Sequence, residues 1–320
     1  MKKILITGGC GFVGSHLTEF IYHKYMKSKI IIFDKITYAG SIENLKNIIS
    51  SKRVKLIKKD INNIEALKKS FVGVDLVINA AAESHVDNSF NLTDEFVITN
   101  VLGTKHILDM CKKYRTKKII HISTDEIYGE IKKNNFKETS SFNPSNPYSS
   151  SKAAAEMIIN GYSYSYKLPT IIVRANNIFG TRQHPEKLIA GCCWSLIKGK
   201  KFYLHGSGKQ KRSFLYIDDF CKAISLLIEK GKRNEIYNVG SNFEYENLDI
   251  AKIITKKMKV DFKKNISFTK DRPFNDFRYS IDYNKIKALG WTPKIKVEDK
   301  IQEIIEWYKN NINRYPKRFI

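Results

Sequence analysis

A glycine-rich segment near the N-terminus constrains the fold of this chain more than any other feature. Residues 8–14 (Gly-Gly-Cys-Gly-Phe-Val-Gly) follow a short apolar run at 3–7 and open a helical pattern. Such glycines permit a tight turn and close backbone approach, and the N-terminus of the following helix favours a pyrophosphate. Asp34, which ends the second apolar run, is placed to bind ribose hydroxyls and to repel a 2′-phosphate. The segment therefore predicts a dinucleotide site that prefers NAD to NADP.

Short apolar runs alternate with helical patterns through the first half of the chain. The runs lie at residues 3–7, 30–33, 54–57, 76–79, 119–123 and 170–173, and the helical stretches include 64–71, 97–114 and 153–166. This alternation predicts a parallel, doubly wound α/β sheet of the Rossmann type.

After about residue 176 the pattern becomes irregular, with glycine-containing turns. Helices are expected near 220–229, 248–258 and 297–310. We therefore expect an NAD-binding Rossmann domain over residues 1–175 that carries the catalytic residues. A smaller, mixed α/β domain over residues 176–320 would bind the substrate, with some interleaving of the two.

The formal net charge of +24 raises the hypothesis of nucleic-acid binding. The excess is mostly lysine in scattered pairs such as Lys58-Lys59 and Lys256-Lys257, without a basic tail or an arginine stripe. This pattern favours a general composition bias, although a positive surface suits an anionic substrate. No apolar run reaches the roughly 18 residues of a membrane helix. The five cysteines include no metal-type C-x-x-C pair, so we expect reduced thiols, no metal and a cytoplasmic location.

Two further segments predict the chemistry. Tyr148 and Lys152 stand four residues apart and would share one face of a helix. A lysine ammonium beside a phenol is expected to lower the tyrosine pKa from about 10, which gives a general base for a sugar hydroxyl. The adjacent acids Asp125 and Glu126 are not needed for hydride transfer alone. A base, an acid and a second base together predict an elimination.

Several stretches extend this pattern over nearly the whole chain. They are T-G-G-C-G-F-V-G-S (7–15), D-K-I-T-Y-A-G (34–40), A-A-A-E-S-H-V-D (80–87), S-T-D-E-I-Y-G (123–129), Y-S-S-S-K (148–152), N-N-I-F-G (176–180), P-E-K-L-I (185–189) and R-P-F-N-D-F-R-Y (272–279). With them the chain resembles the nucleotide-sugar 4,6-dehydratases of the extended short-chain dehydrogenase/reductase superfamily, and T-D-E is the discriminating signature.

The resemblance implies a role for each catalytic residue. Tyr148, helped by Lys152 and a hydrogen bond from Thr124, would deprotonate the C4 hydroxyl of glucose as hydride passes to NAD. Glu126 would remove the C5 proton, and Asp125 would protonate the C6 hydroxyl so that it leaves as water. Hydride would then return to C6. Such an acid needs a raised pKa, which burial and the charge of Glu126 would give, and the restored NAD should stay bound.

The same resemblance implies the binding residues and the assembly. The NAD site would comprise Gly8, Gly11, Phe12, Val13, Gly14, Asp34, Lys35, Asp60, Ile61, Ala80, Ala82, Thr99, Tyr148, Lys152 and Asn177. The nucleotide-sugar would contact Ser84, Thr124, Asn176, Lys187, Leu188, Tyr203, His205, Arg212, Asn238, Arg272 and Asn275. Arg212 and Arg272 would bind its pyrophosphate, whereas His85 is expected to be structural. A homodimer through helices near 97–114 and 152–166 is also implied.

Other functions remain open at this point. The segment 272–279 resembles the dehydratase part of UDP-rhamnose synthases more than the R-P-G-H-D-R-R-Y of bacterial dTDP-glucose enzymes, which favours UDP-glucose over dTDP-glucose. A UDP-sugar 4-epimerase needs no elimination acid, and in a UDP-xylose-type decarboxylase the acid pair would repel the substrate carboxylate. A non-catalytic NAD-sensing or RNA-binding module is favoured only by the charge.

Overall fold

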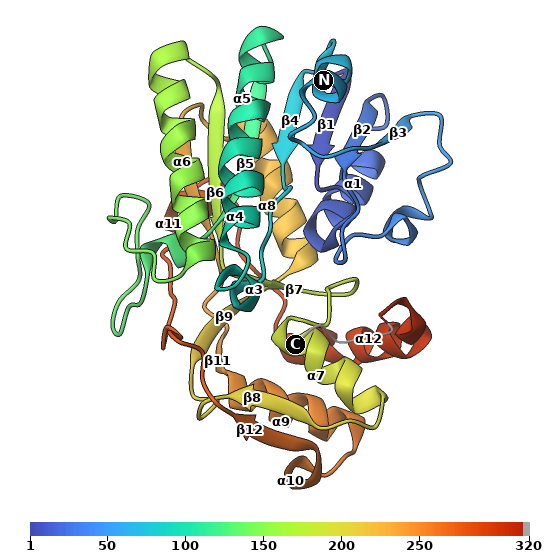
Figure 1. Cartoon of the computed structure of the whole chain (residues 1–320), viewed down its shortest axis with the longest axis vertical. Coiled ribbons are helices and arrows are strands. Elements are labelled where there is room, and N and C mark those ends of the chain that lie inside the picture. The colour runs from blue at the N-terminus through green and yellow to red at the C-terminus, as the bar shows by residue number, and fades with distance from the viewer. Residues whose placement is uncertain (316–320) are drawn as a thin grey trace.

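The computed structural model describes residues 1–315, and its main feature is a seven-stranded parallel sheet (Figure 1). The strand order is β10-β6-β5-β4-β1-β2-β3. The strands are β1 (Lys3–Thr7), β2 (Lys29–Asp34), β3 (Val54–Lys58), β4 (Leu76–Asn79), β5 (Lys118–Thr124), β6 (Thr170–Ala175) and β10 (Glu235–Val239). Most are runs of isoleucine, leucine and valine because helices cover both faces of the sheet.

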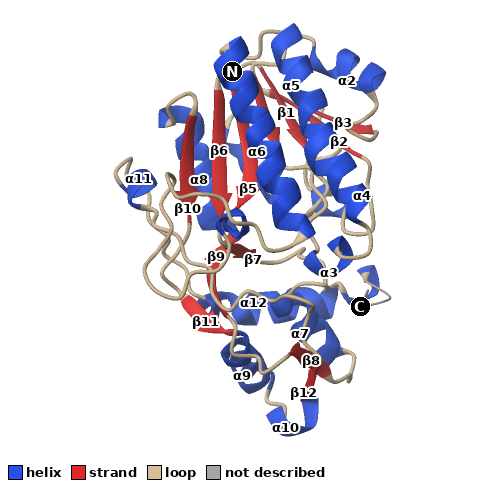
Figure 2. Ribbon diagram, turned by 60° about the vertical axis from the view of Figure 1, so that its left-hand side comes forward, coloured by secondary structure: helices blue, strands red, loops and turns tan. Residues whose placement is uncertain are grey.

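Alternate residues of each strand belong to the two faces. Ile4 and Ile6 of β1 join the core on the side of α1 (Phe12–Lys24) and α8 (Ile217–Lys230). Leu5 joins the core on the opposite side. That side is covered by α2 (Ile64–Phe71), η2 (Val97–Leu102), α5 (Gly103–Lys113) and α6 (Pro147–Tyr166), as Figure 2 shows for α5 and α6. The expected Rossmann-type fold is confirmed.

The second half of the chain forms a smaller α/β part at the carboxyl ends of the sheet strands (Figures 1 and 2). Two small sheets have the orders β11-β9-β7 and β12-β8. Their strands are β7 (Asn177–Phe179), β8 (Phe202–His205), β9 (Lys211–Tyr216), β11 (Glu244–Glu246) and β12 (Ile266–Thr269). The helices of this part are α7 (Leu188–Ile197), α9 (Asn247–Met258), α10 (Phe262–Asn265) and α12 (Val297–Asn310), whereas α11 (Asn284–Lys287) lies beside β10 of the large sheet (Figure 2). The short elements α3 (Val86–Ser89), α4 (Thr93–Phe96), η1 (Ile42–Leu45), η3 (Asp125–Tyr128) and η4 (Ile312–Arg314) complete the described chain.

Two stretches differ from the helices expected there. Helix α6 begins at Pro147 instead of 153, because Asn146 accepts a hydrogen bond from the Ser149 backbone N–H in a capping box. The stretch expected as one helix over 97–114 opens with a π-helical segment, η2. Strand β10 from the second half joins the sheet beside β6, and the division of the chain at residue 175 stays a prediction.

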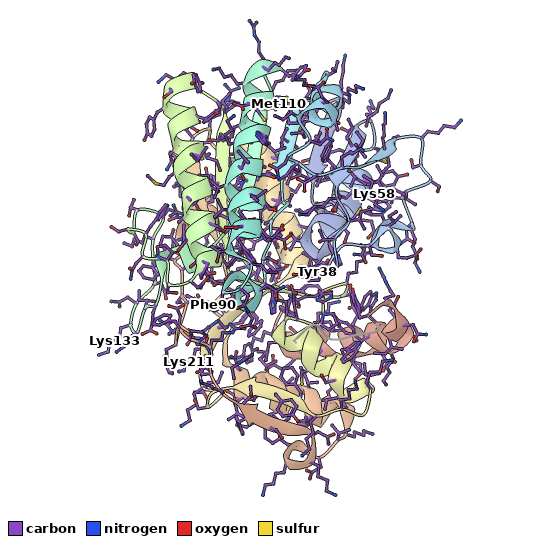
Figure 3. All side chains as sticks on the ribbon, viewed as in Figure 1. Tyr38, Lys58, Phe90, Met110, Lys133 and Lys211 are labelled. Carbon is purple, nitrogen blue, oxygen red and sulfur yellow. The ribbon has the colours of Figure 1, made fainter. Side chains whose placement is uncertain are left out.

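The surface carries the lysine excess in a dispersed form. Lys58 and Lys133 are exposed and lie on opposite sides of the molecule in Figure 3. Within residues 1–315, the helices are all too short or too polar to cross a bilayer.

Candidate active site

A cleft of about 740 Å³ lies at the carboxyl ends of the sheet strands, and residues from both halves of the chain line it. It opens where the strand order reverses, because β4 and β2 flank β1 on opposite sides. Ligands of doubly wound sheets bind at this switch point. The cleft is therefore the site at which the predicted cofactor and substrate residues should meet.

Two glycines shape the end of the cleft that follows β1. Gly8 has a φ of +66°, and a Cβ there would lie 2.7 Å from the Cα of Ala81. A Cβ on Gly14 would lie 2.0 Å from the carbonyl oxygen of Gly8. Among residues 1–315 no side chain caps the N-terminus of α1 at Gly11, so its first N–H groups face the turn. This backbone cradle fits a pyrophosphate.

The charged residues beside this cradle favour NAD. The Asp34 carboxylate accepts hydrogen bonds from the backbone N–H groups of Cys10 (2.8 Å) and Ile36 (2.7 Å), and burial raises its pKa. The ammonium of Lys35 lies 3.5 Å from Asp60 and 3.6 Å from Glu83. The two carboxylates thus offset the positive charge of Lys35, which could otherwise attract the 2′-phosphate of NADP. All of the predicted cofactor residues, from Gly8 to Asn177, line the cleft.

The acid pair lies at the end of β5, in the turn η3. Thr124 caps this turn by accepting a hydrogen bond from the Glu126 backbone N–H at 3.2 Å. Asp125 is only 2% exposed and accepts a 2.6 Å hydrogen bond from Asn176. Burial, and after it the charge of Glu126, raises the pKa of Asp125 to about 7. The expected raised pKa of this acid is confirmed.

Glu126 borders the cleft, whereas Asp125 lies beside it without belonging to its lining. Burial raises the pKa of Glu126, and the charges of Arg212, Lys187 and Arg272 oppose this effect. A carboxylate held among three cations can remain ionised while its neighbour is protonated. The two carboxyl groups are thus suited to opposite roles.

Tyr148 and Lys152 lie one turn apart on α6 and both line the cleft. The Lys152 ammonium donates to the carbonyl oxygen of Ile122 at 2.7 Å, and burial lowers its pKa to about 8. The pKa of Tyr148 is raised, first by burial and then by the charge of Glu126, although a hydrogen bond from Thr124 lowers it. The expectation of a lowered Tyr148 pKa is therefore wrong for the protein alone, because burial and the acids outweigh the hydrogen bond from Thr124.

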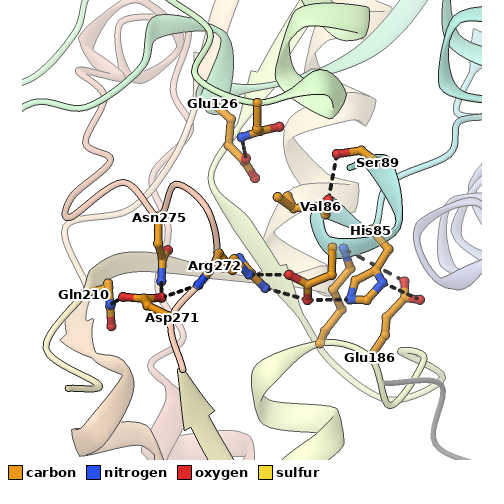
Figure 4. Close-up of polar contacts among 12 residues, drawn as sticks. His85, Val86, Ser89, Glu126, Glu186, Gln210, Asp271, Arg272 and Asn275 are labelled. Carbon is orange, nitrogen blue, oxygen red and sulfur yellow. Dashed lines mark hydrogen bonds and ion pairs between the residues drawn. The ribbon is translucent and has the colours of Figure 1, made fainter. Parts of the chain in front are cut away.

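The arginines expected at the substrate end are held by side chains. Arg212 lies over the ring of Tyr279 at 4.4 Å and donates to Asn275 at 3.3 Å. Arg272 forms an ion pair with Asp87, with Nη2 3.0 Å from Oδ2 (Figure 4). Both arginines line the cleft.

The network around Arg272 continues across the cleft. His85 lies between two carboxylates, with Nε2 3.3 Å from Asp87 and Nδ1 3.8 Å from Glu186 (Figure 4). Lys187 donates to the backbone carbonyl of Ser84 at 2.6 Å. These contacts agree with a structural His85, which stays a prediction. Leu188, Tyr203 and His205 also line the cleft.

Asn238 was predicted to bind the substrate, but the structure places it away from the cleft. It is fully buried on β10 and does not line the cleft. Its side chain accepts from the Tyr128 hydroxyl at 2.9 Å and donates to the carbonyls of Phe136 and Asp282. Its hydrogen-bonding capacity is thus used within the fold. Asn247, the first residue of α9, lines the cleft instead, and its place just before a helical pattern was the available signal.

Comparison with known proteins connects this geometry to a family. Residues 5–304 match the GDP-mannose 4,6 dehydratase family. A dTDP-D-glucose 4,6-dehydratase of Dictyostelium discoideum is 41% identical across 98% of this chain and 83% of its own length. A trifunctional Arabidopsis thaliana protein named for UDP-glucose 4,6-dehydratase and two further activities is 38% identical across 97% of this chain and 48% of its own. The structure of a Streptomyces venezuelae dTDP-glucose 4,6-dehydratase with NAD bound has a TM-score of 0.95 at 33% identity, covering 97% and 98% of the two chains.

The fold and the cleft define a Rossmann-type, NAD-dependent enzyme of the extended short-chain dehydrogenase/reductase superfamily. Within this class the chain belongs to the GDP-mannose 4,6 dehydratase family, as a nucleotide-sugar 4,6-dehydratase and hence a hydro-lyase. The resemblance, the enzyme class and the cofactor expected from the sequence are confirmed. The UDP-glucose 4-epimerase of Thermotoga maritima has a TM-score of 0.89 at 27% identity, so the fold alone does not separate the two activities.

Proposed function

We propose that the enzyme converts UDP-glucose to UDP-4-keto-6-deoxyglucose, the first step towards a 6-deoxy sugar such as UDP-rhamnose. The observation that supports this reaction best is a buried acid with a pKa of about 7, Asp125, beside Glu126 and close to the Tyr148 phenol. An epimerase has no use for such an acid. The UDP preference rests on the segment 272–279, of which Phe274 lines the cleft.

We assign the proton transfers to three side chains, those of Tyr148, Glu126 and Asp125. Tyr148 accepts the proton of the C4 hydroxyl, with Lys152 and Thr124 favouring its phenolate. The resulting ketone acidifies the C5 proton, which Glu126 removes; after exchange with solvent, Glu126 returns a proton to C5 when hydride reaches C6. Asp125 gives its proton to the C6 oxygen, which leaves as water. Bound NAD supplies the acceptor and later the donor of hydride, together with a positive charge that favours the phenolate.

The remaining cleft residues are proposed to bind the nucleotide-sugar. Arg212 and Arg272 offer planar donors to the pyrophosphate. Arg272 would then exchange or share its bond to Asp87, because both acceptors are anionic. Lys187 and Asn176 lie close to the acid pair and would contact the sugar. Asn247 replaces Asn238 in the proposed substrate set.

A dTDP-glucose 4,6-dehydratase is the second candidate, because the relatives that are 41% and 33% identical carry that name. The two substrates differ by one methyl and one ribose hydroxyl. Differences of this size are worth about 1–3 kcal/mol in a pocket. A modest ratio of rates is therefore expected between the two sugars.

Both candidates can be tested by incubating the purified protein, without added NAD, with each sugar separately in deuterated water. Mass spectrometry should show loss of one water and uptake of one deuterium at C5, faster with UDP-glucose. A faster reaction with dTDP-glucose would overturn the proposed base preference. Conversion of glucose to galactose without a change in mass would indicate an epimerase instead.

We also propose a homodimer through η2, α5 and α6. Val97, Ile98, Leu102, Met157 and Tyr164 on these helices are 43–78% exposed. Exposed apolar residues gathered on neighbouring helices are typical of an interface. Met157→Glu combined with Leu102→Glu should shift the protein to a monomer in sedimentation analysis. A wild-type protein that sediments as a monomer would contradict the proposal.

Two further inferences concern the cellular location of the protein and its partners. All five cysteines are buried, which agrees with reduced thiols and a cytoplasmic location. The dispersed arrangement of the lysines argues against a nucleic-acid partner.

A further inference from the structure

Arg174 on β6 is the largest of the fully buried side chains among residues 1–315. Its Nε and Nη2 lie 3.1 Å and 2.7 Å from Oε2 of Glu156, which is also fully buried. Its Nη1 donates to the Tyr128 hydroxyl at 2.6 Å and to the carbonyl oxygen of Glu138 at 3.0 Å. A buried ion pair is often no more stabilising than apolar residues of the same volume. The presence of this ion pair in the sheet therefore indicates that it serves to fix the geometry of the segments it joins.

The two side-chain partners of Arg174 belong to the two segments that carry the proposed chemistry. Glu156 follows Lys152 by one turn and Tyr148 by two turns on α6, so the three share one side of the helix. Tyr128 is the last residue of η3, which begins with the acid pair. One guanidinium thus binds both the helix of the base and the turn of the acids.

A third segment fixes Tyr128 in place. Its hydroxyl donates to Asn238 of β10 at 2.9 Å, while it accepts from Arg174. Its ring stacks on Phe136 with a centroid distance of 5.1 Å and an interplanar angle of 17°. The burial of Asn238, which does not line the cleft, is explained by this contact. The turn η3 is therefore held by hydrogen bonds and by stacking at its C-terminal residue.

We propose that Glu156, Arg174 and Tyr128 form a positioning network that sets the placement of the base on α6 relative to the acids on η3. This inference rests on the catalytic roles proposed above. None of the three residues lines the cleft, so they act through Tyr148, Lys152, Asp125 and Glu126. A displacement of about 1 Å between reacting groups can lower a rate roughly 100-fold.

Glu156 has a second effect, on the charge of Lys152. Burial lowers the pKa of Lys152 to about 8, and the charge of Glu156 opposes this shift. The other polar groups at the Lys152 ammonium are the Ile122 carbonyl at 2.7 Å and His121 Nε2 at 3.4 Å. The pKa of His121 is lowered by burial and by Lys152 itself, so this imidazole is neutral. Loss of the Glu156 charge should therefore lower the pKa of Lys152 further.

Tyr128→Phe tests the network, because it keeps the ring and the ion pair and removes two hydrogen bonds. We expect kcat to fall roughly 10- to 100-fold with an unchanged KM. Enzyme-bound NADH should build up during turnover, because C4 oxidation depends on Tyr148 and Lys152 of α6 with Thr124 of β5, whereas water loss also depends on the acids of η3. Tyr237→Phe is the matched control: this buried tyrosine of β10 accepts from the Lys232 backbone N–H outside the network. It should lower Tm comparably without NADH build-up.

The inference is overturned if Tyr128→Phe and Tyr237→Phe show the same kcat and the same level of bound NADH. A second variant, Glu156→Gln, should shift the alkaline limit of C4 oxidation in single turnovers to lower pH. An unmoved limit in a folded Glu156→Gln protein would remove the electrostatic role of Glu156. If that variant does not fold, the Tyr128→Phe comparison decides by itself. Wild-type protein without dehydratase activity would refute the proposed function separately, before any variant is compared.

Discussion

The two ends of the cleft are built from different parts of the polypeptide. The cofactor end consists largely of backbone, with the Gly8 and Gly14 cradle and the open N-terminus of α1. The substrate end consists of side chains from strands, short helices and loops, with ion pairs such as Arg272 with Asp87. A backbone cradle is complete before the ligand arrives, whereas an ion pair must be rearranged when an anionic ligand binds. The first arrangement suits a retained cofactor and the second suits a substrate that enters and leaves in each cycle.

The acid pair stands between these two ends, and removing it should have the largest effect. In the double variant Asp125→Asn with Glu126→Gln, dehydration should fall by roughly 10²–10⁴-fold or more, the usual contribution of general acid–base groups. C4 oxidation should persist, so bound NADH should accumulate to nearly one equivalent, measured by its absorbance. Tyr148→Phe is the contrasting control, because it should block oxidation and leave NAD bound but unreduced. Normal turnover of the double variant would contradict the assigned roles.

Gly14→Ala alters the backbone cradle at the cofactor end and should have the next largest effect. Its Cβ would lie 2.0 Å from the Gly8 carbonyl oxygen, so the turn must open. We expect loss of co-purified NAD and a lower Tm, since bound ligand stabilises the folded state. Gly161→Ala on α6 is the control: apart from its chain neighbours and the backbone of its own helix, no atom of the described residues lies within 4 Å of its added Cβ, and it should stabilise the helix by about 0.5–1 kcal/mol. A Gly14→Ala protein that retains its NAD would show that the cradle is not rigid.

The difference between the two ends also explains what could be predicted from the sequence. The glycine turn, Asp34 and the strands around them were predictable because their spacing follows from local backbone geometry. Asn238 was wrongly assigned because its partners Tyr128, Phe136 and Asp282 are distant in sequence. The raised pKa of Tyr148 depends on burial and on the charge of Glu126, so it needed the packed structure. The edge strand β10 lies 60 residues beyond its neighbour β6, and no local pattern indicated that pairing.

A smaller effect is expected when one substrate ion pair is removed. Arg272→Ala should raise the KM for the nucleotide-sugar about 10- to 100-fold, because hydrogen bonds to charged groups are worth about 1.5–3 kcal/mol. The amount of bound NAD should not change, since Arg272 contacts Asp87 at the substrate end. Asp87→Asn is the paired variant, which keeps the guanidinium and should change KM only slightly. Equal increases in KM for both variants would mean that Asp87, and not the pyrophosphate contact, accounts for the loss.

The smallest expected effect concerns the pH dependence of the acid. Because the pKa of Asp125 is about 7, the group is protonated below that pH, and dehydration should slow as pH rises through it. The hydrogen bond from Asn176 lowers this pKa. Asn176→Ala should therefore move the alkaline limb of kcat upward by about one pH unit, the equivalent of roughly 1.4 kcal/mol. The limb for C4 oxidation in single turnovers should not move, because Asp125 takes no part in that step. A shift of the alkaline limb of kcat to lower pH would contradict this assignment. Equal shifts of the kcat and C4-oxidation profiles would also mean that Asp125 is not the acid that protonates the C6 oxygen.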